Sequence, residues 1–221
     1  MNAIVAEAKN MKDPFDVVRD FEKELCLYTG AKYAVTTTSC TMALLLACKY
    51  NKVGEVTIPA NTYVGAPMSI INAGGKVKFD EPWNWQKQGF YQLKYTPIYD
   101  SARLFTSDMW KNFGEHPTKW DLKTYFSCVS FHWSKTLGIS QGGAILHNDD
   151  VADPILRKMR FDGRTENIPP KEDNFDVIGY HAYMSPATAA EGLTRLALLP
   201  KNNKPLIETN YTDLRKYDIF K

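Results

Sequence analysis

Four short segments of the sequence carry side chains that could together hold a small charged ligand. Each segment ends, or closely follows, a stretch that is expected to form a β-strand. In open α/β sheets, ligands bind beyond the carboxyl ends of the strands, so the four segments are expected to meet there. They are Ser39-Cys40-Thr41, Thr62-Tyr63, the run YDSAR at 99–103 and the run SFHWSK at 130–135.

The first two segments suit a phosphate and a flat ring. Residues 39–41 precede an apolar run that is expected to be helical. The free backbone N–H groups and the dipole at a helix N-terminus favour a bound phosphate. Tyr63 offers an aromatic face on which a heterocycle can stack.

The other two segments supply a carboxylate, an amine and a hydroxyl. Asp100 is expected at a buried strand end, where an unpaired charge is costly and a protonated ring nitrogen would satisfy it. Lys135 could bond covalently to an aldehyde, as desolvated lysines do. Ser130 is near enough in sequence to reach the same phosphate. The ligand that these groups suit is a phosphorylated aromatic cation.

Each feature alone also has an ordinary structural explanation. A serine or threonine before a helix is usually a cap, and a tyrosine after a strand usually packs in the core. An aspartate at a strand end often shapes a turn, and a lysine in a loop is usually solvated. The functional interpretation therefore depends on the order and spacing of the whole set.

The elements that would position these segments alternate between helix and strand. Apolar residues recur at steps of three and four in the first helix, and Gly30 follows it as a stop. The alternation favours an α/β sheet with helices on its faces. The segment 81–95 is rich in aromatic residues and is expected to be a loop, as is 162–174, and the polar stretch after Pro200 is expected to be loosely held. Helices are expected at 13–28, 41–50, 62–73, 150–160 and 185–199, and strands at 33–37, 55–58, 76–80, 96–99, 125–131 and 144–147.

The composition is that of an ordinary soluble globular protein. The 221 residues are 44% hydrophobic and 24% charged, and the net charge of +2 gives no indication of a nucleic-acid partner. The four cysteines show no C-x-x-C spacing and the four histidines do not cluster, so no metal is expected. The first 16 residues lack a basic segment followed by a long apolar run, and the longest apolar stretch, 42–48, is too short to cross a bilayer. We expect a cytoplasmic protein that does not bind membranes.

Taken in chain order, the motifs resemble the DegT/DnrJ/StrS aminotransferases, which are sugar aminotransferases of fold type I that use pyridoxal 5'-phosphate (PLP). The resemblance runs from about Phe15 to Leu199. The similar blocks are FEKELCLYTGAKYAVTTTSCTMALLLA, IPANTYVGAPMSIINAGGKVKFD, YDSARLF, SFHWSKTLGISQGGAILHND, MRFDG and GYHAYMSPATAAEGLTRL.

The resemblance implies a fold and a set of roles. The fold would be the large α/β domain of the PLP-transferases of fold type I, a mostly parallel sheet flanked by helices, reduced in size. Lys135 would be the Schiff-base lysine and then the base that moves the proton in the 1,3-shift. Asp100 would pair with the pyridine nitrogen and Tyr63 would stack on the ring. Arg103, where the family has glutamine, could face the phenolic oxygen of PLP.

The resemblance also implies how the phosphate is held. Ser39, Cys40 and Thr41 would bind it together with Ser130. In the family, an asparagine from the partner subunit also touches the phosphate, and His181 stands at that position here. A homodimer with shared sites is therefore expected.

Several positions depart from the family pattern. Cys40 stands where the family has glycine, so a Cβ lies where the backbone approaches phosphate. Gln141 replaces a glutamate and Tyr183 an arginine. Family members are also much longer: the segment 81–95 replaces a strand and helix pair, and the C-terminal domain that usually completes the substrate cleft is expected to be largely missing after Pro200. We therefore expect a PLP-binding α/β domain at 1–199, a short tail at 200–221, fewer strands and a more open site.

The function that follows is transfer of an amino group from an amino acid, with glutamate the expected donor, to a keto sugar that is expected to be nucleotide-linked. Two alternatives remain open: a PLP enzyme with a different carbonyl or amino-acid substrate, and a PLP-binding homologue that is non-catalytic or regulatory. Lys135 and Asp100 argue against the second, because scaffolding requires neither. A Rossmann dehydrogenase is disfavoured because no G-x-G-x-x-G follows the first strand.

Overall fold

The computed structural model describes residues 13–113, 124–207 and 210–220. The expectations for residues 1–12 and for His116 lie outside these ranges. None of the described helices is both long and apolar enough to cross a membrane.

The helices are α2 (Asp16–Thr29), α3 (Cys40–Tyr50), α4 (Gly65–Asn72), α5 (Met109–Phe113), α6 (Ala152–Arg160) and α7 (Pro186–Leu198), with short 3₁₀ helices η1 (Trp85–Lys87), η2 (Leu214–Lys216) and η3 (Asp218–Phe220). The strands are β1 (Tyr33–Thr37), β2 (Glu55–Pro59), β3 (Lys76–Asp80), β4 (Tyr91–Gln92), β5 (Ile98–Asp100), β6 (Phe126–Ser130) and β7 (Gly143–His147).

The strands form one five-stranded sheet and one strand pair. The larger sheet has the order β1-β7-β6-β5-β4, and β2 pairs with β3. β5 and β6 are parallel, whereas β7 is antiparallel to both of its neighbours and β4 is antiparallel to β5. An antiparallel bridge between Thr57 and Lys94 links β2 to the chain just after β4. Five of the described strands thus run in one direction, and β4 and β7 are reversed. In the five-stranded sheet only the β5–β6 pairing is parallel, so the sheet is mixed where a mostly parallel one was expected, because β7 lies between two strands of the opposite direction and β4 adds a reversed edge.

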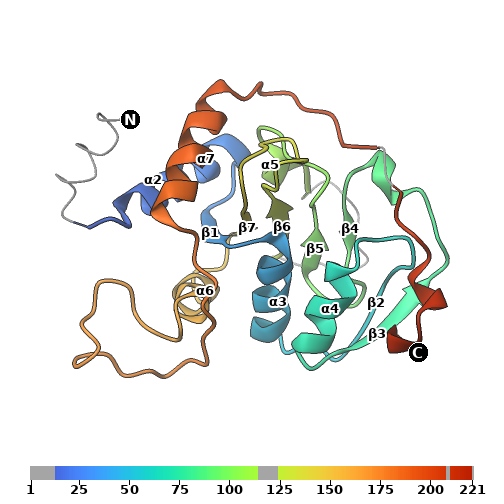
Figure 1. The fold of residues 1–221 in the computed structure, drawn as a ribbon, viewed down its shortest axis with the longest axis horizontal. Helices are drawn as coiled ribbons and strands as arrows, with labels where there is room; N and C mark the ends of the chain where they lie inside the picture. Colours follow the sequence, from blue (N-terminus) through green and yellow to red (C-terminus); the bar gives the residue numbers. More distant parts are fainter. Residues whose placement is uncertain (1–12, 114–123, 208–209, 221) are drawn as a thin grey trace.

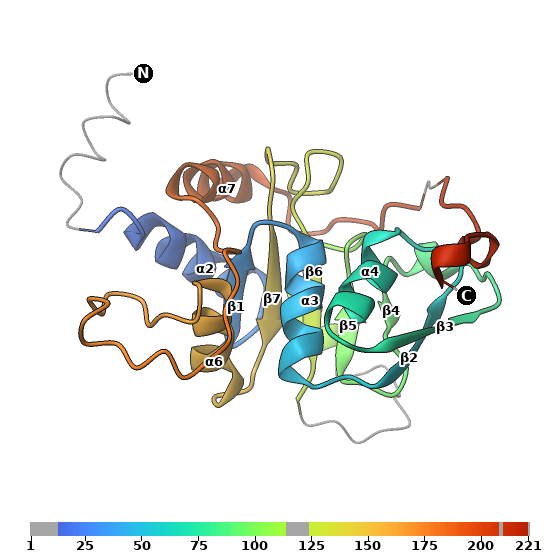
Figure 2. The ribbon, with the colours of Figure 1, turned by 60° about the horizontal axis from the view of Figure 1, so that its bottom comes forward.

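Helices cover both faces of the larger sheet (Figure 2). Successive residues of a strand point to opposite faces, so Val35 joins the cluster formed with α3, α4 and α6, whereas Ala34 joins the cluster formed with α2 and α7. Leu46 of α3 and Phe21 of α2 are fully buried in these two clusters. The expected α/β architecture with flanking helices is therefore confirmed.

Local sequence accounts for the ends of these helices. Gly30, with φ of 80°, ends α2 in the left-handed conformation, and its N–H donates to the carbonyl of Cys26. Ser185 caps α7 by accepting from the N–H of Thr188, and proline follows at the first helical turn. α7 packs closely on α2 because Gly192 has no side chain: a Cβ there would lie 2.5 Å from the ring of Phe21.

Two expectations for irregular segments were wrong. The segment 81–95 is not entirely loop, because it holds η1 and the edge strand β4. The chain after Pro200 is not loosely held: Leu214 is only 3% exposed and its N–H donates to the carbonyl of Ala60 at 2.9 Å. Figure 1 shows this segment, in red, running from α7 across the top of the sheet to the strand pair β2–β3. Its few apolar side chains have no helical or strand period, which is why the sequence alone does not reveal their packing.

Candidate functional site

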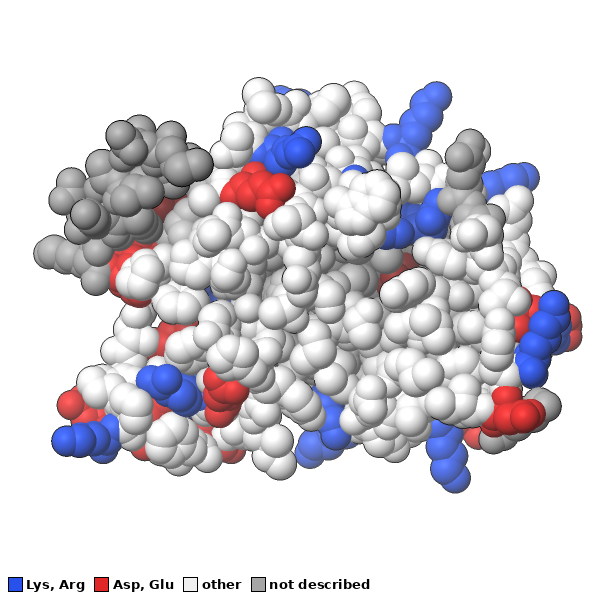
Figure 3. All heavy atoms as spheres, viewed as in Figure 1, with Lys and Arg blue, Asp and Glu red and all other residues white. Residues whose placement is uncertain are grey.

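The four predicted segments meet at one pocket of about 380 Å³. They do so because β1, β2, β5 and β6 run in the same direction and end at the same edge of the fold. In Figure 3, basic and acidic side chains lie close together at a hollow to the right of centre, above the position of α4 in Figure 1. The predicted residues that line the pocket are Ser39, Cys40, Thr41, Tyr63, Asp100, Arg103, Ser130 and Lys135.

Further lining residues were missed by sequence reasoning. His132, Ser134 and Gln141 also line the pocket, and they belong to the motifs quoted around Lys135, so their position in sequence could have revealed them. Asn210 and Tyr211 line it from the C-terminal segment, where no motif pointed to them. The C-terminal segment is therefore part of the pocket wall.

The N-terminus of α3 forms the side of the pocket that suits a phosphate. Ser39 is extended, with φ of −166°, and its hydroxyl accepts from the N–H of Met42 at 3.2 Å. The thiol of Cys40 donates to the carbonyl of Cys128 at 3.5 Å, so the side chain that replaces the family's glycine is engaged with β6. Gly143 of β7 packs against this turn so closely that a Cβ there would lie 2.4 Å from the nitrogen of Cys40.

Tyr63 and Thr41 are held beside each other at the start of α4. Gly65 makes this possible, because a Cβ on it would lie 2.6 Å from Thr41 Oγ1 and 2.8 Å from the Tyr63 ring. Tyr63 is 55% exposed, and its ring centroid lies 6.2 Å from that of Tyr211. A half-exposed aromatic face thus lines the pocket, as stacking on a bound ring requires.

Asp100 is the buried carboxylate of the pocket. It is 4% exposed, its Oδ1 accepts from the N–H of Ala102 at 3.0 Å, and its Oδ2 accepts from the hydroxyl of Tyr91 at 2.8 Å. Burial raises the pKa of Asp100, while these two hydrogen bonds and the charge of Lys135 act to lower it. Tyr91 comes from the segment that was expected to be a loop, so sequence reasoning missed this contact.

Lys135 lies in the turn that follows β6. Its N–H donates to the carbonyl of His132 at 2.7 Å, and its side chain makes no hydrogen bond to any other residue that the structure describes. Burial, followed by the charge of Arg103, lowers the pKa of Lys135, and the charge of Asp100 opposes this. A partly buried amine with a lowered pKa is better able to act as a nucleophile and base near neutral pH.

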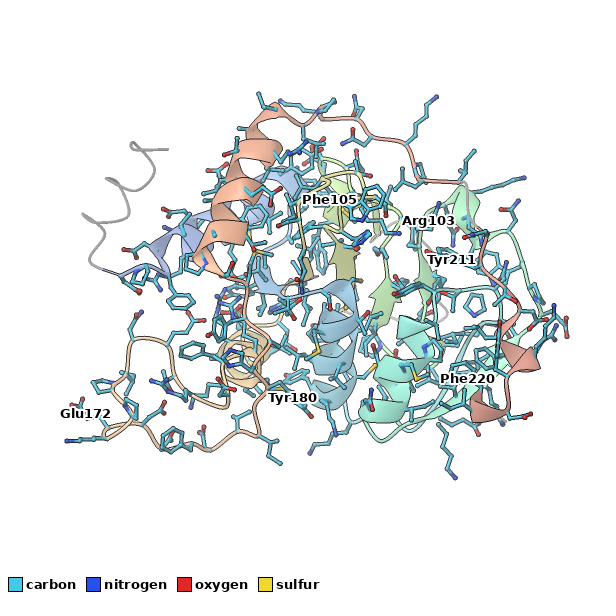
Figure 4. All side chains as sticks on the ribbon, in the orientation of Figure 1. Arg103, Phe105, Glu172, Tyr180, Tyr211 and Phe220 are labelled. Atoms are coloured by element: carbon cyan, nitrogen blue, oxygen red, sulfur yellow. The ribbon has the colours of Figure 1, made fainter. Side chains whose placement is uncertain are left out.

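Arg103 is held in the wall of the pocket by the C-terminal segment. Its Nε donates to the carbonyl of Leu206 at 2.5 Å, and the N–H of Leu206 donates back to the carbonyl of Arg103 at 2.9 Å. The guanidinium lies 5.7 Å from the centre of the Tyr211 ring, and Figure 4 shows the two side chains close together. Arg103 is only 7% exposed. Because water screens a buried charge weakly, the guanidinium interacts strongly with the other charged groups of the pocket.

His181 is the predicted site residue that does not line this pocket. Its side chain is 73% exposed, and its Nδ1 lies 2.9 Å from Asp162 Oδ2. Its ring packs edge-on against Tyr183. Its expected contact with a partner subunit's cofactor stays a prediction.

The described residues fit PLP in both charge and chemistry. A helix N-terminus and Ser130 suit the phosphate, the exposed face of Tyr63 suits the ring, and the buried Asp100 suits a protonated ring nitrogen. The amine of Lys135 has no hydrogen-bond partner among the described residues and lines the same pocket. The cluster therefore has the groups that bind such a cofactor, in one cavity.

The sequence profile of the DegT/DnrJ/EryC1/StrS aminotransferase family matches residues 3–82 and 122–212. The chain belongs to this family. The two matched stretches hold Lys135 and the phosphate-side residues, whereas Asp100 and Arg103 lie between them. The assignment of those two residues in this DegT/DnrJ/EryC1/StrS chain thus depends on the geometry of the pocket and on the motif YDSARLF.

Individual relatives agree with the family. The chain is 40% identical over 65 residues to the spore coat polysaccharide biosynthesis protein SpsC of Bacillus subtilis, a match that covers 28% of this chain and 17% of that protein. The fold is similar to S. venezuelae DesV, with a TM-score of 0.65 at 20% identity over 88% of this chain and 60% of that one. A family aminotransferase from Brucella abortus gives 0.66 at 19% identity, over 89% and 62%.

A third solved structure carries a form of the cofactor. The Bacillus subtilis NtdA structure with bound cofactor PMP gives a TM-score of 0.64 at 19% identity, over 83% of this chain and 48% of that one. These similarities confirm the expected fold of a PLP-dependent aminotransferase. The chain spans at most about three fifths of the length of these solved relatives.

Proposed function

We propose that this protein is a PLP-dependent aminotransferase that moves an amino group from an amino acid, with glutamate the expected donor, to a nucleotide-linked keto sugar. The observation that carries the proposal is the pocket where Lys135 and the buried Asp100 meet the N-terminus of α3. Family membership and the similar fold support the reaction type, and the similarity to SpsC supports a sugar substrate. His181 and a homodimer with shared sites belong to the same proposal.

When bound, PLP supplies an electron-poor ring that stabilises negative charge beside the reacting amine. Lys135 would hold the cofactor covalently through its amine and then move the proton between the two carbons that exchange it. Its lowered pKa favours the neutral amine that both tasks need. Asp100 would pair with the ring nitrogen and keep it protonated.

The remaining residues would bind and orient the cofactor. The backbone N–H groups at the start of α3 and the hydroxyl of Ser130 would hold the phosphate. Tyr63 would stack on the ring, and Tyr211, from the C-terminal segment, would close the wall beside it and exclude water. Arg103 would face the phenolic oxygen and place a positive charge beside Lys135.

The direct test is cofactor attachment. Incubation with PLP should give the visible absorbance band of lysine-linked PLP, and borohydride reduction followed by peptide mapping should place the label on Lys135. Lys135→Ala should lose both signals. Lys23→Ala, a change at a side chain that is 73% exposed on α2, should keep them. Absence of the band in the wild-type protein would overturn the proposal.

A second measurement separates the transferase from its alternatives. Glutamate added to the PLP-loaded protein should remove the visible band, and a nucleotide-linked keto sugar should restore it. Restoration by another carbonyl compound alone would identify a different substrate class. Bound PLP that no amino acid converts would support the non-catalytic homologue instead.

A further inference from the structure

Tyr91 lies directly opposite Asp100 on the neighbouring strand β4. Its hydroxyl donates to Asp100 Oδ2 at 2.8 Å, and the two residues are 2% and 4% exposed. Tyr91 comes from 81–95, where the sequence departs from the family, and it lies outside both stretches that the family profile matches. Asp100 also lies between the two matched stretches, so the family profile covers neither partner of this contact.

When Asp100 is ionised, the hydrogen bonds around Tyr91 run in one direction. A tyrosine hydroxyl has one proton, and an ionised carboxylate has none to give, so this proton lies toward Asp100. The hydroxyl of Thr62, 2.8 Å from the Tyr91 oxygen, must therefore donate to Tyr91. The chain Thr62 to Tyr91 to Asp100 ends on the carboxylate, and in a buried setting each bond polarises the next.

These bonds fix both the charge and the direction of the carboxylate. Ala102 engages Oδ1 and Tyr91 engages Oδ2, so the carboxylate cannot rotate without breaking a buried hydrogen bond. Burial raises the pKa of Asp100, and the Tyr91 hydroxyl is among the groups that act against this. Without Tyr91, the buried carboxylate would therefore take up a proton more readily.

The ring of Tyr91 is itself fixed by aromatic neighbours. Trp85, which is 1% exposed, packs edge-on against it at 4.8 Å between ring centroids. Trp85 lies nearly parallel to Tyr211, at 11° and 6.3 Å, and Tyr211 lines the pocket. Trp85 thus contacts both rings, and through it the C-terminal segment helps to fix the position of Tyr91.

We propose that Tyr91 is a positioning residue that holds Asp100 ionised and directed at the ring nitrogen of PLP. The proposal rests on the proposed function, since it requires PLP in this pocket. Tyr91 acts through Asp100 and does not touch the cofactor. Its removal should therefore matter only for a ligand whose ring nitrogen can bind a carboxylate.

The proposal can therefore be tested by comparing PLP with an analogue that has no ring nitrogen. Dissociation constants are measured for PLP and for the PLP analogue in which carbon replaces the ring nitrogen, with wild type, Tyr91→Phe and Tyr125→Phe. Tyr91→Phe should weaken PLP roughly tenfold or more, as expected for the loss of a hydrogen bond to a charged group, and the analogue far less. Tyr125→Phe removes another tyrosine hydrogen bond, to the carbonyl of Trp110, and should leave both constants unchanged.

The outcomes separate the two proposals. A wild-type protein that does not bind PLP overturns both. A wild type that binds PLP, with a Tyr91→Phe variant that weakens PLP and the analogue equally or neither of them, overturns the positioning role alone.

A second variant and a second measurement cover the case in which Tyr91→Phe does not fold. Thr62→Val removes only the donor to Tyr91 and should weaken PLP more than the analogue, in the same direction as Tyr91→Phe. The ¹⁵N chemical shift of labelled PLP bound to wild type should be that of a protonated ring nitrogen. A neutral ring nitrogen, or equal effects of Thr62→Val on the two ligands, would overturn the positioning role.

Discussion

Replacing Glu22 with glutamine removes a buried negative charge that faces two arginines. Glu22 of α2 is 4% exposed, and Arg160 of α6 is 1% exposed. Arg160 donates to Glu22 Oε1, and Arg157 donates to Oε2 at 2.6 Å. Arg160 also donates to the carbonyl of Thr36 at 2.8 Å, just before the turn that leads into α3. The cluster therefore joins α2, β1 and α6 behind the phosphate side of the pocket.

The expected loss follows from this burial. Removing one partner of a buried ion pair costs about 3–5 kcal/mol when it leaves the other charge uncompensated. Here Arg160 keeps its ion pair with Glu166 and Arg157 keeps its ion pair with Asp153, so the loss should lie near the lower end of this range. Glutamine has nearly the same shape, but it carries no charge and turns an N–H₂ group toward donors. For a protein of this size, each kcal/mol lowers Tm by about 2–4 °C. Glu22→Gln should therefore remove a large part of a free energy of unfolding that is typically about 5–15 kcal/mol.

The assay is urea unfolding followed by tryptophan fluorescence and far-UV circular dichroism. The control is Lys23→Ala, which breaks an ion pair between side chains that are 73% and 58% exposed and should change stability by less than about 1 kcal/mol. A Glu22→Gln loss as small as that of the control would refute the reasoning.

The same substitution gives a prediction for pH. Burial raises the pKa of Glu22, but the charges of Arg160 and Arg157 and their hydrogen bonds outweigh it, so the folded pKa lies below the ordinary value. The contribution of Glu22 is therefore fully present above the unfolded pKa of about 4.3 and is lost as pH falls through the folded pKa. The stability difference between wild type and Glu22→Gln should be constant near neutral pH and should shrink in acid.

Two further predictions concern the pocket. Gly143→Ala places a Cβ against the turn before α3, 2.4 Å from a backbone nitrogen, and should cost about 1–3 kcal/mol in unfolding experiments and weaken PLP binding. Gly54→Ala, which has open space around it, is the control, and equal behaviour of the two variants would contradict the prediction. Arg103→Met removes a positive charge that lowers the pKa of Lys135, so that pKa should rise. The pH dependence of Lys135 acylation in cofactor-free protein should then shift upward, and an unchanged profile would show that burial alone sets its reactivity.

Much of the fold follows from local patterns. The strand expected at 33–37 and the helix expected at 41–50 agree with β1 and α3. Both depend on local features, the spacing of apolar residues and the Ser39 cap, which can be recognised in a short stretch of sequence. The edge strand β4 could not be foreseen in the same way. It has two residues, too few for a period, and it forms because β5 offers it a partner.

The sequence by itself determined that the residues of the four motif segments gather at the pocket. Lys135 and Asp100 each follow or end a strand, and strands that run in one direction deliver their carboxyl ends to one edge. Only the tertiary structure decided what surrounds them. Tyr91 meets Asp100 across a strand pair, and Tyr211 reaches Arg103 from more than a hundred residues away. Contacts of this kind depend on how segments that are distant in sequence pack together, and the local periodicity of a sequence does not predict such packing.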